Sequence, residues 1–337
     1  MSPSKQIRMP AEWEEHEATW LAWPYDKISF GSLNEPEGKP DRERLARVQK
    51  TFLQVISALS GSEQVNLIVR DTKQYPYILK YVGMFEVDYA DVWTRDYMPS
   101  FLDDGTAVKW DYDAYGSKFP DLLKDNEVFS PSFIKEGEGG SSGDIEFVRP
   151  GIILEGGAIE VNGQGTLLTT EQCLLKRNPQ MSKVDYENVF AKYLGISKVI
   201  WLKQGIVNDH TDGHIDDVAR FVNENKVVCA WEENPNDPNF PILSSAYDTL
   251  SADFEVVKLP MPHMIYRNDQ KAPASYANFY IANKVVLMPI YNDPNDERVL
   301  EIIRAQFPGR DIIPIDCSDL IYGGGAIHCA TSSQPKI

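Results

Sequence analysis

The chain has 337 residues, of which 42% are hydrophobic and 11% aromatic, so it can bury a large core. Its 50 acidic and 33 basic residues give a net charge of −17, which argues against nucleic acid or an anionic membrane as a partner and favours a cationic ligand. The N-terminal segment lacks the apolar core of a signal peptide, and no run of about 18 apolar residues could span a membrane. Four scattered cysteines without a CxxC motif predict a reducing, cytoplasmic location rather than a disulfide scaffold.

Four segments are predicted to form helices. Apolar residues recur at helical spacing in 41–59, 183–195 and 296–309, and more weakly in 241–252. Gly195 is expected to end the second of these helices as a C-cap, and Pro308 with Gly309 the third. Short apolar segments at 197–202, 254–259 and 311–315 follow three of the helices and are expected to be strands.

A strand–turn–strand unit recurs between the helices. It is found at 94–110, 155–170, 213–231 and 276–290, each with a polar turn between two apolar stretches. The segment 323–333 resembles the start of a fifth unit that the end of the chain cuts short. Regular repeats of this kind indicate radial or solenoid stacking within one α/β domain that covers residues 1–337. The low-complexity stretch 135–144 is expected to be a mobile surface loop.

The repeated units begin with different polar residues. Asp96, Glu155, His214, Asn278 and Cys329 occupy matching places, at intervals of 59, 59, 64 and 51 residues. A solenoid would tend to repeat its surface residues, whereas these five differ in chemistry. If the units close into a ring, all five side chains point towards its centre.

Cys329 is the candidate nucleophile. It follows three glycines, which allow a ligand or another backbone to approach closely, and it precedes a polar segment. The other cysteines, Cys173, Cys229 and Cys317, lie in or beside apolar runs and are expected to be buried and inert.

The segment 208–217, "NDHTDGHIDD", admits two interpretations. His210 and His214 are four residues apart, so on a helix they could bind the metal of a hydrolase. Gly213 and the aspartates disfavour a helix, however, and in an extended strand His214 and Asp216 would share one face. By the same reasoning His328 and Cys329 would point to opposite faces and would not be partners.

The remaining candidates are a thiol, a histidine and the carboxylates of Asp96, Glu155 and Asp216. Such a set could hydrolyse an amide, but carboxylates beside a cysteine oppose formation of its thiolate. Three acids suit a substrate that brings a positive charge, and a planar guanidinium matches carboxylates in a bidentate manner. A non-catalytic module that binds cations is the other alternative.

The sequence resembles the family of agmatine deiminases and bacterial-type peptidyl-arginine deiminases. The motifs that carry the resemblance run in order from residue 9 to residue 335: "MPAEWEEHEATWLAWP", "VWTRDYMPSF", "LEGGAIEVNGQGTLLTTEQCLLKRNP", "TDGHIDDVARF" and "YGGGAIHCATSSQP". The resemblance implies a five-module pseudo-symmetric α/β propeller, the pentein fold, which agrees with the repeat.

The resemblance also implies roles for the motif residues. Cys329 would be the nucleophile, His214 the general acid and base, and Asp96 and Asp216 the carboxylates that hold the guanidinium. Glu155 would partner the histidine or contact the substrate. Trp93 is a candidate wall of the pocket.

The expected activity is hydrolysis of agmatine to N-carbamoylputrescine and ammonia, with peptidyl-arginine deimination as the alternative. Agmatine has no carboxylate that would need a cationic partner, so an acid-rich site favours it. No metal or organic cofactor is expected, and the family implies a homo-oligomer. Asp212 and Tyr97 depart from the family pattern, and we expect them to alter how the tail of the substrate is held.

Overall fold

The structure is a computed structural model that describes residues 7–25, 30, 43–75, 78, 80–130, 145–263, 265–267 and 270–337. The segment 135–144, predicted to be a mobile loop, lies outside the described residues. Within them, none of the helices combines the length and the apolar character that a bilayer crossing requires.

Four three-stranded sheets share one pattern, in which an antiparallel pair is followed by a parallel strand. Their strands are β4 (Ser100–Phe101), β5 (Ala107–Val108) and β6 (Phe147–Val148); β7 (Ile159–Val161), β8 (Thr166–Thr170) and β9 (Lys198–Leu202); β10 (Ala219–Asn223), β11 (Lys226–Trp231) and β12 (Glu255–Pro260); and β15 (Tyr280–Ile281), β16 (Val285–Ile290) and β17 (Asp311–Asp316). In each sheet the antiparallel pair is one of the predicted strand–turn–strand units, so the repeat is confirmed.

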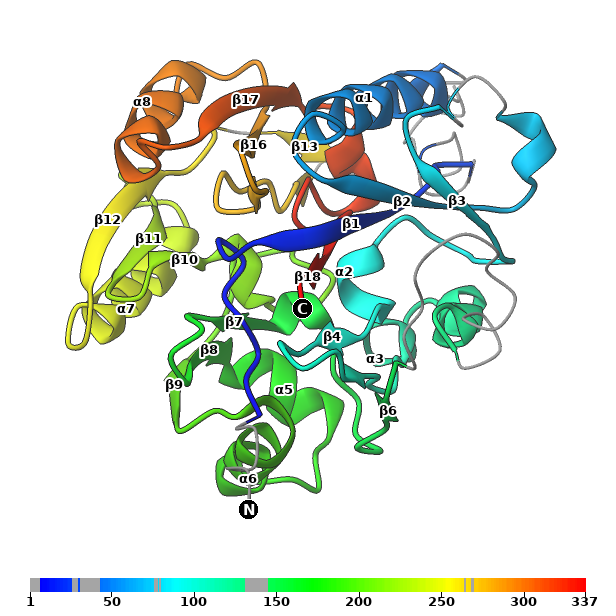
Figure 1. Ribbon diagram of the computed structural model, residues 1–337. Coiled ribbons are helices and arrows are strands. Elements are labelled where there is room, and N and C mark those ends of the chain that lie inside the picture. The colour runs from blue at the N-terminus through cyan, green and yellow to red at the C-terminus, as the bar shows by residue number, and fades with distance from the viewer. Residues whose placement is uncertain are drawn as a thin grey trace.

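The two ends of the chain build the fifth sheet together. Strand β18 (Ser332–Pro335) pairs antiparallel with β1 (His16–Ala22), which pairs parallel with β2 (Gln64–Val69), and β3 (Gly83–Glu86) lies at the edge. The side chain of Trp20 adds a hydrogen bond from Nε1 to Oε1 of Gln334, 2.9 Å long. The fifth unit is therefore not incomplete, because the N-terminal strand supplies the part that the C-terminus lacks. The sheets surround a centre beside which β18 and the C-terminal end lie (Figure 1).

The four predicted helices are confirmed as α1 (Arg44–Leu59), α6 (Lys183–Leu194), α7 (Asn239–Leu250) and α8 (Asp296–Gln306), and they lie round the outside (Figure 1). The apolar face of α1 includes Val48, Phe52 and Leu59, all buried in the largest core cluster. Gly195 caps α6 with φ +72°, as expected of a left-handed C-cap. The shorter elements are α2 (Thr94–Tyr97), α3 (Ala114–Ser117), α5 (Glu171–Arg177) and the hairpin of β13 (Tyr266–Arg267) and β14 (Gln270–Lys271), together with 3₁₀ turns at Thr72–Gln74, Pro120–Glu127, Gly156–Ala158, Ile215–Asp217 and Leu320–Gly323.

None of the polar residues that open the units lies on a strand: Asp96 is in the short helix α2, and the others are in turns or irregular segments. His214 immediately precedes the 3₁₀ turn Ile215–Asp217, and Cys329 lies in a turn where the backbone N of Ala330 donates to the carbonyl of Ala326. The prediction that 214–216 and 328–329 are extended is therefore wrong. Local hydrogen bonds explain the difference at the first turn, because the carboxylate of Asp209 accepts from the backbone N of Gly213 and of His214.

The pairing of β18 with β1 predicts that a short C-terminal truncation is severely destabilising. Removing residues 332–337 should lower the free energy of unfolding by roughly 3 kcal/mol or more, since each net backbone hydrogen bond contributes about 1 kcal/mol. Urea denaturation followed by circular dichroism measures the effect. Removing only Ile337, whose exposed fraction is 71%, is the control and should leave stability unchanged. Equal urea concentrations at the midpoint of unfolding for both truncations would show that β18 is not important for stability.

Candidate active site

Side chains from two units converge on Gly157, which belongs to a third. A Cβ atom placed on this glycine would lie 2.6 Å from Nδ1 of His214, 2.8 Å from Oδ1 of Asp96 and 3.1 Å from Oδ2 of Asp216. No side chain fits there, because Cβ contacts under 3.0 Å do not occur in real structures. Predicted site residues that are 59 and 61 positions from Gly157 in the sequence, Asp216 and Asp96, are thus assembled round one point in space.

Cys329 adjoins this cluster, and its exposed fraction is 6%. Its Sγ accepts a 3.0 Å hydrogen bond from Nδ2 of Asn278 and lies 3.6 Å from Oδ2 of Asp216. The carboxamide of Asn278 also fixes the backbone, since its Oδ1 accepts from the N of Cys329 at 3.2 Å. The sulfur is therefore held between one neutral donor and one carboxylate.

The resting thiol of Cys329 is protonated. Burial raises the pKa of Cys329 well above its usual value, and the charges of Asp216, Asp217 and Asp96 raise it further. The hydrogen bond from Asn278 favours the thiolate but does not offset three carboxylates. A cation placed among these acids would lower the pKa of Cys329 and favour its thiolate.

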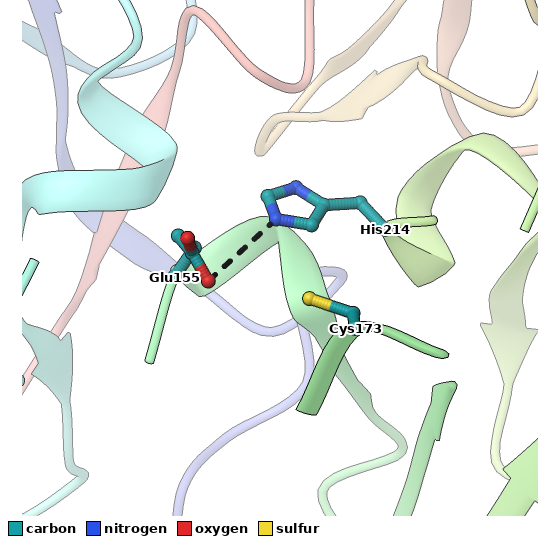
Figure 2. Close-up of side chains that lie close together, drawn as sticks. All are labelled: Glu155, Cys173 and His214. Atoms are coloured by element: carbon teal, nitrogen blue, oxygen red, sulfur yellow. Dashed lines mark ion pairs between the residues drawn. The ribbon is translucent and has the colours of Figure 1, made fainter. Parts of the chain in front are cut away.

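His214 is buried between two carboxylates. Its Nδ1 lies 3.6 Å from Oδ1 of Asp96, and its Nε2 lies 3.9 Å from Oε2 of Glu155, as the dashed line in Figure 2 marks. Among the described residues neither ring nitrogen of His214 has a hydrogen-bond partner. The same is true of Oε2 of Glu155. Buried polar atoms without partners are costly, so this space is arranged for polar groups of a ligand.

The environment sets the protonation of these groups. Burial opposes the charged form of His214, but Asp96, Cys173 and Glu155 outweigh it and raise the pKa of His214 well above the usual value. Burial also raises the pKa of Asp96 to about 6, although His214 and the hydroxyl of Tyr115 oppose the shift. For Glu155 the effect of burial is outweighed by His214 and Arg177, which lower the pKa of the carboxyl.

Trp93 covers the glycine run that precedes Cys329. Cβ atoms on Gly323 or Gly325 would lie 2.7 or 2.8 Å from its indole ring, and one on Gly325 would also lie 3.1 Å from Sγ of Cys329. Glycines are therefore required here, because the indole and Cys329 both lie against this segment. Tyr97, in contrast, is packed in the core, where its hydroxyl donates to the carbonyl of Asp91.

Asp212 is paired with cations of the chain itself. Its carboxylate lies 2.8 Å from Nζ of Lys118, 2.6 Å from Nζ of Lys176 and 2.7 Å from Nη1 of Arg177. Burial opposes its ionisation, but these three cations hold the pKa of Asp212 well below the usual value. Arg177 in turn donates from Nε to Oε1 of Glu155 at 2.6 Å, so Asp212 supports Glu155 through Arg177.

The metal pair of His210 and His214, which the sequence left open as an alternative, does not form among the described residues. Among the described residues, donor atoms converge in one group, Glu155, Cys173 and His214, whose ligand atoms all lie within 4.8 Å of one another (Figure 2). The ring of His210 instead packs edge-on against Tyr115, with centroids 5.1 Å apart. The three converging donors are of types that bind zinc, but a metal there would occupy the lone pairs of His214.

Three residues beside the site have contacts that sequence reasoning did not assign. Asn278 bonds to the nucleophile, Cys173 faces His214, and Nδ1 of His328 lies 2.8 Å from Oδ2 of Asp216. The repeat already placed Asn278 in register with the other polar residues, so that signal was available. Cys173 and His328 gave no such signal, because neither occupies the repeated place.

Comparison with known proteins identifies the family. The family model of the Porphyromonas-type peptidyl-arginine deiminases matches residues 8–335. The chain belongs to this family. A protein of Legionella pneumophila, provisionally named an agmatine deiminase, is 33% identical over 346 residues, which cover 97% of this chain and 94% of the relative.

Solved structures of this family have the same fold. A cysteine-to-serine variant of C. jejuni agmatine deiminase with substrate bound superposes with a TM-score of 0.86 at 28% identity, covering 100% of this chain and 99% of that one. An agmatine deiminase of Enterococcus faecalis gives a TM-score of 0.84 at 31% identity, with the same coverage. The predicted pentein propeller is thereby confirmed.

The convergence on Gly157 predicts the effect of one added methyl group in this peptidyl-arginine deiminase family member. Gly157→Ala should reduce kcat/KM measured with a guanidine compound such as agmatine about 100-fold or more, because displacement of reacting groups by about 1 Å costs that much. Steady-state ammonia release measures the effect. Gly61→Ala, where a Cβ meets no atom within 4 Å, is the control. Unchanged turnover by Gly157→Ala would show that the three side chains do not act at this point.

Proposed function

We propose that the protein is an agmatine deiminase, which hydrolyses agmatine to N-carbamoylputrescine and ammonia through a covalent intermediate on Cys329. The observation that carries the proposal is a buried thiol among carboxylates that keep it protonated until a cation arrives. A neutral substrate would leave the repulsion between the Cys329 thiolate and these carboxylates in place. A guanidinium removes it and is at the same time the group that the thiolate attacks.

Binding of the guanidinium uses Asp96 and Asp216. Oδ1 of Asp216 has no hydrogen-bond partner among the described residues, whereas Oδ2 is held by His328. Both oxygens of Asp96 are fixed, one by the hydroxyl of Tyr115 at 2.8 Å and one by the backbone N of Gly157 at 3.0 Å. Hydrogen bonds to charged groups contribute about 1.5–3 kcal/mol each, so two oriented carboxylates hold the guanidinium firmly.

In the first half of the reaction the bound cation stabilises the thiolate, and the proton of Cys329 leaves for solvent. The sulfur adds to the central carbon of the guanidinium, forming a C–S bond. His214, protonated at rest, gives its proton to a departing nitrogen as the C–N bond breaks and ammonia is released. A cationic S-alkylthiouronium remains on Cys329, still paired with the carboxylates.

In the second half a water molecule replaces ammonia. Neutral His214 removes its proton as the oxygen attacks the same carbon, and this restores the imidazolium. The C–S bond then breaks with Cys329 as the leaving group, the hydroxyl proton of the adduct passes to the departing sulfur, and the neutral ureido product and the Cys329 thiol form. Glu155 supports the positive charge of His214 in both halves, with Arg177 and Asp212 holding Glu155 in place.

The choice of agmatine is supported by the relatives and by charge. The two solved structures are agmatine deiminases, one of them with substrate bound, and the Legionella relative is provisionally named as one. Peptidyl-arginine deimination is the second candidate, because the matching family model bears that description. We also propose a cytoplasmic homo-oligomer, which is consistent with the four cysteines being free thiols.

Substitution of the nucleophile tests the chemistry. Cys329→Ser should lower kcat on agmatine by a factor on the order of 10⁴ or more, since removal of a nucleophile costs that much in hydrolases. The unaltered protein, acid-quenched during turnover and examined by mass spectrometry, should carry a thiouronium adduct on Cys329. Cys229→Ser, in which another buried thiol is changed, is the matched control and should retain turnover.

Parallel assays with agmatine, free arginine and an arginine-terminated peptide separate the two candidate substrates. Rapid citrullination of the peptide without turnover of agmatine would replace the first candidate by the second. Full activity of Cys329→Ser on every guanidine would refute both.

The acid limb of the pH profile tests the role of Asp96. Its carboxylate must be ionised, so kcat/KM should fall as the pH decreases through about 6. Tyr115→Phe removes a hydrogen bond that favours the ionised form and should move the limb upward by roughly 0.5–1 unit. Tyr186→Phe, which removes a buried hydroxyl that donates to the carbonyl of Leu174, should leave the limb in place. A downward shift with Tyr115→Phe would contradict the assignment.

A further inference from the structure

A buried chain of polar side chains leads from Asp216 to the N-terminal segment. Oδ2 of Asp216 lies 2.8 Å from Nδ1 of His328, and Nε2 of His328 lies 2.9 Å from Oε2 of Glu12. His328 and Asp216 are almost wholly buried, with exposed fractions of 1% and 0%. Glu12 belongs to the motif 9–24, to which the proposed reaction assigns no role.

The two contacts fix the protonation of His328. A neutral imidazole has one N–H and one lone pair, so it can donate to a single carboxylate. With a carboxylate at each nitrogen, a neutral ring would direct its lone pair at a carboxylate oxygen in a buried site. An imidazolium donates to both and satisfies the geometry, so His328 carries two N–H groups.

Glu12 is itself anchored from two sides. Nη2 of Arg95 donates to its Oε2 at 2.7 Å, and Nη2 of Arg220 donates to its Oε1 at 2.7 Å. Arg95 also donates from Nε to the carbonyl of His328 at 3.3 Å. The ring of His328 therefore has a fixed partner on its far side, and its orientation towards Asp216 is set by groups from three elements.

We propose that His328 is a positioning residue that, as an imidazolium held by Glu12, keeps Asp216 ionised and leaves Oδ1 of Asp216 free for the guanidinium. The inference rests on the proposed function, because it concerns the same substrate. It explains why Oδ2 is engaged while Oδ1 has no partner among the described residues. It also gives a role to His328, which adjoins Cys329 in the sequence. In the described part of the chain His328 makes no hydrogen bond to the thiol of Cys329.

The electrostatics of the surroundings agree. Burial would raise the pKa of Asp216, but the hydrogen bond and charge of His328 outweigh it and lower the pKa. Burial likewise opposes ionisation of Glu12, and Arg220, His328 and Arg95 together lower its pKa. Two groups of charged and titratable residues surround the pair of His328 and Asp216. On the side away from the pocket these are Glu12, Arg95, Glu160 and Arg220. Towards the pocket they are Asp96, His214, Asp217 and Cys329.

Agmatine binding to a catalytically silent protein tests the proposal. In full-length Cys329→Ser, isothermal titration between about pH 5.5 and 8.5 gives the Kd of agmatine, and adding His328→Gln should raise it about tenfold or more. The ratio of the two Kd values should grow as the pH falls, because Asp216 without its cationic partner becomes protonated at a higher pH. A purely structural role would change the ratio equally at every pH.

His16→Gln in the same background is the matched control. His16 is another buried histidine beside a carboxylate, with Nδ1 3.1 Å from Oε1 of Glu63, and among the described residues it makes no hydrogen bond or ion pair with Asp216. We expect it to lower stability without a pH-dependent change of the Kd. Kd ratios within about twofold of one at every pH for a folded His328→Gln protein would overturn the proposal.

A second measurement needs no variant of His328. NMR of the histidine ring nitrogens in the isotope-labelled, unaltered protein should show both nitrogens of His328 protonated, and a neutral ring would overturn the proposal. Failure of Cys329→Ser to bind any agmatine would refute the proposed function instead. The NMR result would then decide the state of His328 independently.

Discussion

The repulsion between a sulfur anion and its carboxylate neighbours governs the whole site. Cys329 is surrounded by Asp216, Asp217 and Asp96, and all of them disfavour its thiolate. In most thiol enzymes a nearby cation of the protein offsets such a cost. In the proposed reaction that function falls to the ligand, so the Cys329 thiolate forms only when the electrophile is present. The same arrangement protects the thiol from other reactions, because the anion is the reactive form.

The way the chain closes places the nucleophile. The turn that contains Cys329 ends immediately before β18, which is held by β1. The N-terminal segment that leads into β1 also carries Glu12, whose carboxylate lies next to His328. Both ends of the chain thus meet at the fifth sheet, and the step that completes the fold also completes the site. A closed ring suits this chemistry, since each unit supplies one polar residue to a common centre.

Much of the fold and of the candidate site could be predicted from the sequence, because the repeat shows as a periodic pattern of apolar and polar residues. The helices, the strand pairs and the register of Asp96, Glu155, His214, Asn278 and Cys329 all follow from local patterns. The contacts of His328 could not be found in this way, since they join residues more than one hundred positions apart. The prediction of extended backbone at 214–216 failed because the carboxylate of Asp209 accepts hydrogen bonds from the backbone of Gly213 and His214, and a local contact between a side chain and the backbone leaves no periodic signal. Asp212 was expected to face the substrate, yet three cations that are distant in sequence surround it.

The acid-rich pocket also determines how the proposed reaction ends. The guanidinium and the thiouronium are both cations, so both keep charge-assisted hydrogen bonds to Asp96 and Asp216. The ureido product is neutral, and its bonds to the same carboxylates are about half as strong as those of the cations. Its formation also returns the negative charges of the pocket to their uncompensated state, which favours protonation of Cys329 and departure of the product. The electrostatic repulsion that the substrate relieves on entry is therefore restored by the chemistry itself, and this favours release of the product.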